Sequence, residues 1–214
     1  MHLVSDAARP GSFAPCCIVM LPAAFCRPED FVQQGFVSAV RARALAVDLC
    51  FAQPEGRHLT DRSVLARLRE EIVLPAHARG ATVWLGGISL GGFLAASYAA
   101  RHGAELRGLC LLAPYLGSHL ITGEIQRAGG VQAWQPGALP DGDDDEQRVW
   151  QLLKRGEASG FALHLGLGAA DRFASRHRLL AAALPPASVD EVAGGHDWPT
   201  WRKLWENFLL RRIA

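Results

Sequence analysis

The sequence is poor in lysine and carries no strong excess of charge of either sign. Of its 22 basic residues only Lys154 and Lys203 are lysines, so arginine supplies nearly all of the positive charge. The formal net charge is +1 at pH 7, because positive and negative side chains almost cancel. This balance gives no reason to expect a nucleic acid or an anionic membrane as a partner.

Long apolar runs, paired cysteine motifs and metal-binding spacings are also missing. The five cysteines, an odd number with apolar neighbours, predict reduced and mostly buried thiols. No C-x-x-C or H-x-E pattern indicates zinc, and no apolar run is long enough to span a membrane. Residues 1–15 lack the basic start and the apolar run of a signal peptide. We therefore expect a cytoplasmic protein without a metal, a cofactor or a membrane partner.

What the sequence does contain is enough apolar residues to build one sizeable core. Half of its 214 residues are hydrophobic, which suits a single domain over residues 1–214. Apolar runs of strand length alternate with helical patterns along the chain. Because these runs are apolar throughout, we expect a parallel sheet covered by helices on both sides, which is a three-layer α/β/α sandwich. The expected strands lie at 16–21, 44–51, 82–85, 106–112, 161–167 and 187–192.

Two segments break this alternation. Residues 1–15 contain two prolines and a glycine and are expected to form an irregular lead-in. Residues 116–160 are rich in glycine, proline and acidic side chains, and we interpret them as a small cap-like insertion with short helices near 124–128 and 146–154. The acidic run at 141–146 is expected to cap the second of these helices, with a metal site as the alternative.

A serine stands at the centre of a strand-to-helix turn. Gly87, Ser89 and Gly91 form a G-x-S-x-G motif between the expected strand 82–85 and a helix of small residues at 93–100. In a nucleophile elbow of this kind the serine occupies a strained turn, and glycines are needed two residues to either side of it. The alternative is an ordinary glycine turn in which Ser89 only caps the helix.

Two further residues with chemical potential follow later strands of the expected sheet. Asp171 comes after strand 161–167, and His196 comes after strand 187–192. Groups at the carboxyl ends of parallel strands meet at one edge of the sheet. A serine hydroxyl needs a base to take its proton and a carboxylate to orient that base. We predict Ser89 as the nucleophile, His196 as the general base and acid, and Asp171 as the residue that orients His196.

Other residues compete for these roles. Asp197 is adjacent to His196 and would have difficulty reaching the ring of its own neighbour, while Asp190 lies too early, within a strand. The acidic run 141–146 is a further candidate, and His196 itself is alternatively an ordinary loop histidine. Five other histidines are expected on the surface or on strand faces: His58, His77, His102, His119 and His164.

A developing oxyanion needs two backbone N–H donors close to the nucleophile. The first is expected at Leu90, which follows the nucleophile, and the second at Ala23 or Ala24 in the loop after the first expected strand. Phe25 and Tyr115 are expected near the mouth of the pocket, where they either line it or only pack.

These motifs together resemble those of the α/β-hydrolase fold. The similar stretches are Gly87 to Gly91, Gly168 to Asp171 and Gly195 to Trp198, and residues 194–208 are similar to the tails of bacterial esterase-like members, in which tryptophans follow the catalytic histidine. The resemblance covers nearly the whole chain. It implies hydrolysis of carboxylic esters or thioesters through an acyl-enzyme intermediate.

The sequence departs from this family in two places. Pro22-Ala23 stands where the family usually has His-Gly, which makes Ala24 the expected second donor. The chain also begins at the strand that the family counts as third, so the two preceding strands, one of them antiparallel, are expected to be absent. We therefore predict a minimal sheet of six parallel strands in the order 2-1-3-4-5-6, with 116–160 as a partial lid over an open cleft.

The leading hypothesis is a serine hydrolase that acts on a small-molecule carboxylic ester. A thioesterase with the same three residues is the first alternative. A non-catalytic binding protein on the same fold is the second. The sequence does not specify an oligomeric state.

Overall fold

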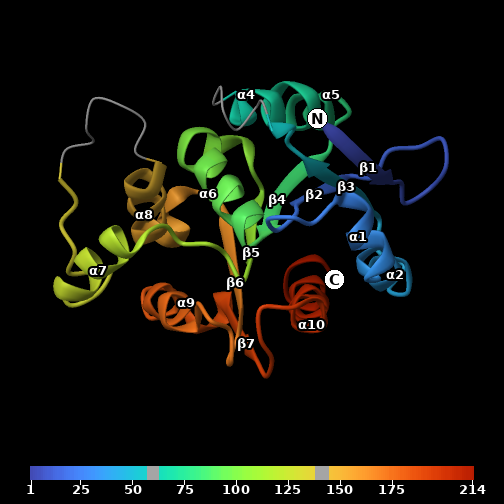
Figure 1. Ribbon diagram of the computed structural model, residues 1–214. Helices are drawn as coiled ribbons and strands as arrows, with labels where there is room; N and C mark the ends of the chain where they lie inside the picture. Colours follow the sequence, from blue (N-terminus) through green and yellow to red (C-terminus); the bar gives the residue numbers. More distant parts are fainter. Residues whose placement is uncertain (57–62, 138–144) are drawn as a thin grey trace.

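A sheet of seven strands runs through the centre of the computed structural model, which describes residues 1–56, 63–137 and 145–214 (Figure 1). Its spatial order is β1-β3-β2-β4-β5-β6-β7. Every neighbouring pair is parallel except β1 and β3, which are antiparallel. The strands are β1 (His2–Asp6), β2 (Cys16–Leu21), β3 (Val47–Gln53), β4 (Thr82–Ile88), β5 (Gly108–Leu112), β6 (Ala162–Gly168) and β7 (Val189–Val192).

The six predicted strands are present in the predicted order, and the architecture is the predicted α/β sandwich. The prediction that the sheet is wholly parallel and begins at residue 16 is wrong, because β1 adds an antiparallel strand at the edge. Its five residues are all exposed or half-buried, and only Leu3 and Val4 are apolar, so the strand lacks the long apolar run of the central strands. An exposed edge strand of this kind resembles a polar lead-in when only the sequence is known.

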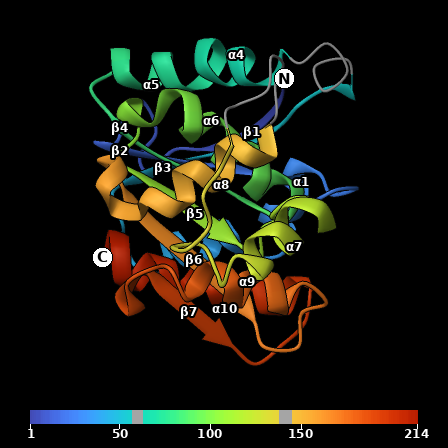
Figure 2. The same ribbon diagram turned by 90° about the vertical axis from the view of Figure 1, so that its left-hand side faces the viewer.

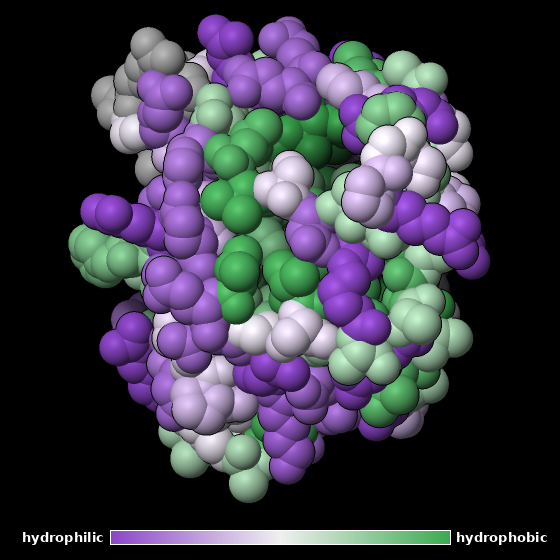
Figure 3. All heavy atoms as spheres, turned by 90° about the vertical axis from the view of Figure 1, so that its right-hand side faces the viewer, coloured by the Kyte–Doolittle hydropathy of each residue, from purple (hydrophilic) through white to green (hydrophobic). Residues whose placement is uncertain are grey.

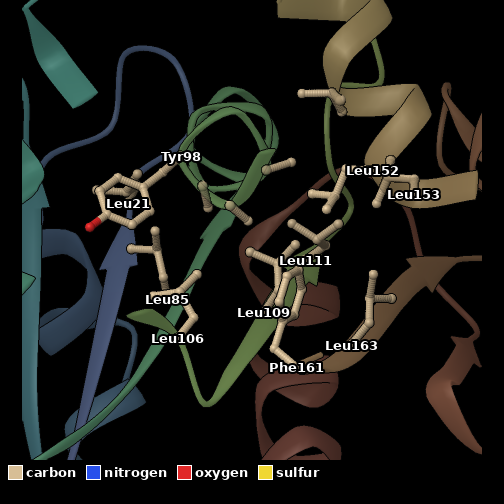
Figure 4. Close-up of a cluster of buried hydrophobic side chains, with 14 of the residues drawn as sticks. Leu21, Leu85, Tyr98, Leu106, Leu109, Leu111, Leu152, Leu153, Phe161 and Leu163 are labelled. Carbon is tan, nitrogen blue, oxygen red and sulfur yellow. The ribbon is translucent and has the colours of Figure 1, made fainter. Parts of the chain in front are cut away.

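One face of the sheet is covered by helices that follow the inner strands (Figure 2). A cluster of buried leucines and aromatic rings fills the space between α6, α8 and the sheet (Figure 4). In this cluster Leu109 and Leu111 from β5 lie between the helices and Leu163 of β6. The helices of this face are α4 (Val64–Leu68), the π-helical turn η1 (Arg69–Val73), α5 (Leu74–Ala78), α6 (Leu90–His102), α8 (Asp145–Arg155) and α9 (Ala174–Ala181).

The opposite face is covered by α1 (Pro28–Gln33), α2 (Phe36–Arg41) and α10 (Trp198–Phe208), which ends in the π-helical turn η5 (Leu209–Ile213). Gly35 separates the first two helices by adopting φ +82°, a conformation that glycine tolerates best. The ring of Trp205 stacks on Phe36 at 5.3 Å, and its indole N–H donates to the Phe36 carbonyl over 3.0 Å. These contacts fix α10, and therefore the loop before it, against the sheet.

The segment 116–160 contains α7 (His119–Arg127), α8 and the short 3-10 helix η3 (Gly156–Ser159). Both expected helices exist, although the first begins five residues earlier than its predicted start at 124. The apolar side of α8 belongs to the core beneath α6, and Trp150 donates its indole N–H to the Leu116 carbonyl over 2.9 Å. The predicted cap-like role of the segment stays a prediction.

Two predicted features fall partly or wholly outside the described residues. The acidic run 141–146 is described only at Asp145 and Glu146, which lie in the first turn of α8. The sequence also predicts a helix that opens at Thr60 and Asp61 and continues to about residue 77; its start lies outside the described residues, and the described part runs from Val64 to Ala78. No helix within the described ranges is long and apolar enough to cross a membrane.

Candidate active site

Ser89 occupies a strained turn between β4 and α6. Its φ of +52° and ψ of −115° are unusual for a residue with a side chain. The turn is held from both sides, because the Ser89 N–H donates to the Leu112 carbonyl over 3.1 Å and the Ser89 carbonyl accepts from the N–H of Tyr115 over 2.9 Å. These two hydrogen bonds fix the strained backbone of Ser89 to the end of the neighbouring strand β5 and to the loop after it.

The two glycines of the motif are required by close backbone contacts. A Cβ atom on Gly87 would lie 2.3 Å from the carbonyl carbon of Gly91. A Cβ atom on Gly91 would lie 2.2 Å from the Leu21 carbonyl oxygen at the end of β2. Both distances are far below van der Waals contact, so the elbow tolerates no side chain at either position.

The loops after β6 and β7 are joined by backbone hydrogen bonds. The N–H of Ala169 donates to the Val192 carbonyl over 2.8 Å, and the N–H of Ala170 donates to the Gly194 carbonyl over 2.9 Å. Gly168 allows this approach, since a Cβ there would lie 2.6 Å from the Gly194 oxygen. These bonds bring the residues that follow, Asp171 and His196, to neighbouring positions.

Asp171 and His196 form a hydrogen-bonded pair. Nδ1 of His196 lies 2.7 Å from Oδ2 of Asp171, whose side chain is fully buried while that of His196 is 11% exposed. Burial alone raises the pKa of the Asp171 carboxyl. The hydrogen bonds from His196 and from the Phe173 backbone N–H outweigh this effect and lower the pKa below its usual value. The carboxylate is therefore ionised at neutral pH and lies in hydrogen-bond contact with the imidazole.

Two aromatic rings fix the plane of the His196 imidazole. Phe173 and Trp201 each pack edge-on against it, at centroid distances of 5.2 Å and 5.1 Å and interplanar angles of 86° and 88°. The sequence analysis did not assign either residue to the site. The sequence feature that could have assigned them to the site is their spacing. Phe173 lies two residues after Asp171, and Trp201 lies one helical turn after Asp197.

The third predicted member of the set, Ser89, follows a different strand of the sheet. Within the part of the chain that the structure describes, no hydrogen bond joins the Ser89 hydroxyl to the imidazole of His196. Ser89 lies at the carboxyl end of β4, and the other two residues follow β6 and β7 at the same edge of the sheet. The arrangement of Ser89 with His196 stays a prediction.

The rival carboxylates have other partners. Asp197 caps α10, accepting the N–H of Thr200 over 3.0 Å and its hydroxyl over 2.7 Å. Asp190 is buried in β7 and accepts from Arg211 over 3.0 Å. The described part of the acidic run lies in α8, where Glu146 binds the backbone N–H and hydroxyl of Ser118. Asp171 is the carboxylate that contacts His196.

The loop after β2 lies against the elbow, as expected for an oxyanion-binding loop. The Leu21 and Pro22 carbonyl oxygens are the atoms that a side chain at Gly91 would meet. Ala23 is buried, Ala24 is exposed, and the Ala23 carbonyl closes the turn by accepting from Cys26 over 3.1 Å. Leu90 begins α6, where the first backbone N–H groups have no partner within the helix. The oxyanion-binding role of Leu90 with Ala23 or Ala24 stays a prediction.

The two predicted pocket residues differ in their surroundings. Phe25 has a φ of +65°, and its side chain is fully exposed. Tyr115 is half-buried, packs its ring against Phe93 at 5.6 Å and donates its hydroxyl to Glu146 over 3.5 Å. Glu146 thereby connects the segment 116–160 to the strand end beside Ser89.

His177 is a buried histidine near the site that the sequence analysis did not consider. One ring nitrogen, Nε2, lies 2.9 Å from the Pro114 carbonyl, next to the residue that binds the Ser89 backbone. Burial lowers the pKa of His177, so the ring is neutral and donates this hydrogen bond. It connects α9 to the loop after β5.

The remaining histidines are distributed as follows. His77 and His119 are exposed, His102 is half-buried at the end of α6, and His164 is fully buried on β6. His58 lies outside the described residues. No cluster of three or more potential metal ligands occurs within the described ranges.

No protein-family model and no curated protein matches the sequence. Solved structures of similar fold include Est1E from Butyrivibrio proteoclasticus, with a TM-score of 0.67 and 14% identity over 99% of this chain and 94% of that one. FphF, a fluorophosphonate-binding serine hydrolase of Staphylococcus aureus, matches with a TM-score of 0.68 and 12% identity over 99% and 92%. An S-formylglutathione hydrolase from Agrobacterium tumefaciens matches with a TM-score of 0.60 and 15% identity over 94% and 86%. This chain therefore has the α/β-hydrolase fold.

Proposed function

We propose that this protein is a serine hydrolase that cleaves carboxylic esters through an acyl-enzyme intermediate. Ser89 is the nucleophile, His196 the general base and acid, and Asp171 the carboxylate that orients His196. The observation that carries the proposal is the 2.7 Å contact between His196 and Asp171 at the sheet edge where the strained turn presents Ser89. Similarity in fold to esterases and serine hydrolases supports the same chemistry.

In the first half of the reaction Nε2 of His196 takes the proton of the Ser89 hydroxyl. The Ser89 oxygen then forms a bond to the ester carbonyl carbon, and negative charge develops on the carbonyl oxygen. The backbone N–H groups of Leu90 and Ala24, or Ala23, are the proposed donors to this oxygen. The hydrogen bond from His196 to Asp171 stabilises the imidazolium that forms.

The bond between the carbonyl carbon and the alcohol oxygen then breaks, His196 gives its proton to the departing alcohol, and the acyl-enzyme remains. The second half of the reaction hydrolyses this acyl-enzyme. Water then enters, loses a proton to His196 and attacks the acyl carbon. The carboxylic acid leaves, and the proton returns to the Ser89 oxygen. A hydrogen bond between the Ser89 hydroxyl and His196 is expected to form in the substrate complex, since catalytic hydrogen bonds often tighten only when substrate is bound.

Turnover of p-nitrophenyl butyrate tests the proposal. Ser89→Ala is expected to lower turnover by about 10⁶-fold. The matched control is Ser97→Ala in α6, the helix that Ser89 precedes. The Ser97 hydroxyl is buried and has no hydrogen-bond partner among the described residues, so its loss is expected to leave turnover unchanged. Equal turnover by Ser89→Ala and the native protein would contradict the proposal.

A thioester is the second candidate substrate for the same residues. Two of the solved structures of similar fold are S-formylglutathione hydrolases, from Staphylococcus aureus and Agrobacterium tumefaciens. The chemistry of acylation is the same when sulfur leaves instead of oxygen. Comparing kcat/KM for p-nitrophenyl butyrate and butyryl-coenzyme A distinguishes an oxyester hydrolase from a thioesterase. A thioesterase is expected to show the higher kcat/KM with butyryl-coenzyme A, and an ester hydrolase with p-nitrophenyl butyrate.

The partner proposed for the site is a small-molecule ester or thioester. A cytoplasmic location, the absence of a nucleic-acid or membrane partner and the absence of a cofactor stay predictions from the sequence. The non-catalytic alternative, a binding protein on this fold, is separated from the hydrolase by covalent labelling of Ser89.

A further inference from the structure

A cavity of about 470 Å³ lies at the amino ends of the parallel strands, away from Ser89 and His196. It opens at the sheet edge formed by β1 and β3, between the loop that connects β1 to β2 and the helix formed by η1 and α5. Figure 3 faces this side of the molecule and shows apolar residues gathered in a hollow with hydrophilic residues around it. Its size is within the usual range for a small-molecule site.

The loop between β1 and β2 roofs the cavity and is held closed by one carboxylate. Asp48 on β3 accepts the N–H of Ala8 over 2.9 Å and the N–H of Ala14 over 3.0 Å. These two bonds fold the loop back over the sheet edge. Phe13 stands in the loop, lines the cavity and remains 67% exposed. An exposed aromatic ring at a cavity mouth provides apolar contact area for a ligand.

The floor of the cavity is apolar. It includes Leu3 of β1, Cys17 of β2, Cys50 of β3 and Ile72 of η1. Burial raises the pKa of Cys17 to about 12 and that of Cys50 to about 11, so both thiols are neutral at physiological pH. The floor therefore favours a hydrocarbon group rather than a charged one.

The acidic residues of the cavity wall already have partners. Asp6 accepts from Arg41 over 2.6 Å, and Glu71 forms an ion pair with Arg67 at 3.5 Å. Asp48 is occupied by the two backbone N–H groups of the roof. Two of these three carboxylates are therefore paired with an arginine, and the third is hydrogen-bonded to the backbone of the loop.

The basic residue of the wall has no such partner. Within the part of the chain that the structure describes, Arg79 forms no ion pair, and its guanidinium carbon lies 4.6 Å from the centroid of the Phe13 ring. A guanidinium held against an aromatic ring still presents N–H groups at its edge, in the geometry that suits a carboxylate.

We propose that this cavity is a second binding site, separate from Ser89, for a small carboxylic acid with an apolar tail. The tail lies on the floor of Leu3, Cys17, Cys50 and Ile72, and the carboxylate pairs with Arg79 beneath Phe13. The site accepts a free acid and does not act on it chemically.

Isothermal titration calorimetry with octanoate tests this site in the Ser89→Ala protein, so that binding is measured without turnover. We expect one octanoate per chain, and at least a tenfold weaker affinity for octan-1-ol, which lacks the charge. Arg79→Gln is expected to weaken octanoate binding at least tenfold. The matched control is Arg9→Gln. Arg9 is exposed in the loop between β1 and β2 and does not line the cavity, so this variant is expected to bind octanoate like the parent.

A blocking variant makes the test independent of charge. Ser5 is exposed on β1 and lines the cavity, so Ser5→Trp is expected to fill it and abolish octanoate binding while the thermal unfolding temperature stays within a few degrees of the parent. Two results would overturn the proposal. One is the absence of octanoate binding to the parent, and the other is octanoate binding that Arg79→Gln and Ser5→Trp leave unchanged. Esterase turnover is measured separately, so its loss or presence does not decide this question.

Discussion

The imidazole of His196 lies 2.7 Å from the carboxylate of Asp171, although 25 positions separate the two residues in the chain. The contact forms because two backbone hydrogen bonds, from Ala169 to Val192 and from Ala170 to Gly194, join the chain after β6 to the end of β7 just before these residues. Gly168 permits their approach, and α10 holds the loop of His196 in place through the Asp197 cap. The pair therefore depends on the order of the strands in the sheet and on the space that Gly168 leaves between the two segments.

Asp171 and Asp197 are expected to respond differently to substitution. Asp171→Asn keeps the shape of the side chain but removes the charge that orients His196, so turnover of p-nitrophenyl butyrate is expected to fall by roughly 10⁴-fold. Asp197→Ala removes a helix cap, so we expect a loss of about 1 kcal/mol in the free energy of unfolding with most of the turnover retained. The reverse pattern, with Asp197 essential and Asp171 dispensable, would contradict the assignment.

The backbone strain at Ser89 has a measurable signature that does not depend on activity. Glycine tolerates a φ of +52° with less cost than a residue with a side chain. The free energy of unfolding of Ser89→Gly is therefore expected to be about 1 kcal/mol higher than that of Ser89→Ala. Urea denaturation of the two inactive proteins measures the difference. Equal stabilities would mean that the turn stores no strain.

The elbow glycine and a helix glycine provide a matched pair. Gly91→Ala places a methyl group against the Leu21 carbonyl oxygen, so we expect a loss of about 1–3 kcal/mol in stability together with a fall in turnover. Among the described residues, a Cβ atom on Gly123 in α7 would meet nothing within 4 Å apart from its chain neighbours and the backbone of its own helix. Gly123→Ala is therefore expected to raise the free energy of unfolding by about 0.5–1 kcal/mol. Thermal and urea unfolding of both variants measures these changes. The prediction is contradicted if both substitutions change the free energy of unfolding in the same direction.

His164 is expected to make the fold sensitive to acid. Burial, with Arg212 and Arg211 nearby, lowers the pKa of His164 to about 3, whereas an unfolded histidine titrates near 6.5. Between these values the unfolded chain binds more protons, so the free energy of unfolding falls as the pH decreases from about 6.5 towards 3.

The variant His164→Leu removes this proton uptake from the unfolded chain. It also removes two buried ring nitrogens that have no hydrogen-bond partner. Between pH 7 and pH 4.5 the variant is expected to lose about 2 kcal/mol less stability than the native protein, as measured by urea denaturation at both pH values. Identical losses in the two proteins would show that His164 is not responsible.

The interior of this fold was predictable because its central strands are rich in apolar residues on both faces. The six runs from Cys16 onwards indicated a buried parallel sheet, and the elbow glycines marked the turn at Ser89. The edge strand β1 was missed because it is short, exposed or half-buried at every position, and has only two apolar residues, Leu3 and Val4.

The surroundings of the site were less predictable than its position. Spacing along the chain indicates which strand end a residue follows, and on this basis we expected Asp171 and His196 at one edge of the sheet, where their side chains lie 2.7 Å apart. The packing of Phe173 and Trp201 on the imidazole, and the bond from His177 to Pro114, depend on how separate helices meet in space. No periodicity in the sequence encodes those orientations.

Covalent labelling by a fluorophosphonate probe is the most direct test of the central claim, that Ser89, His196 and Asp171 act together. The folded native protein is expected to gain one phosphonyl group, located on Ser89 by mass spectrometry of its peptides, and His196→Gln is expected to lose most of this labelling while remaining folded. Ser97→Ala is expected to label like the native protein. A folded native protein that gains no adduct, or gains it on another residue, would contradict the account.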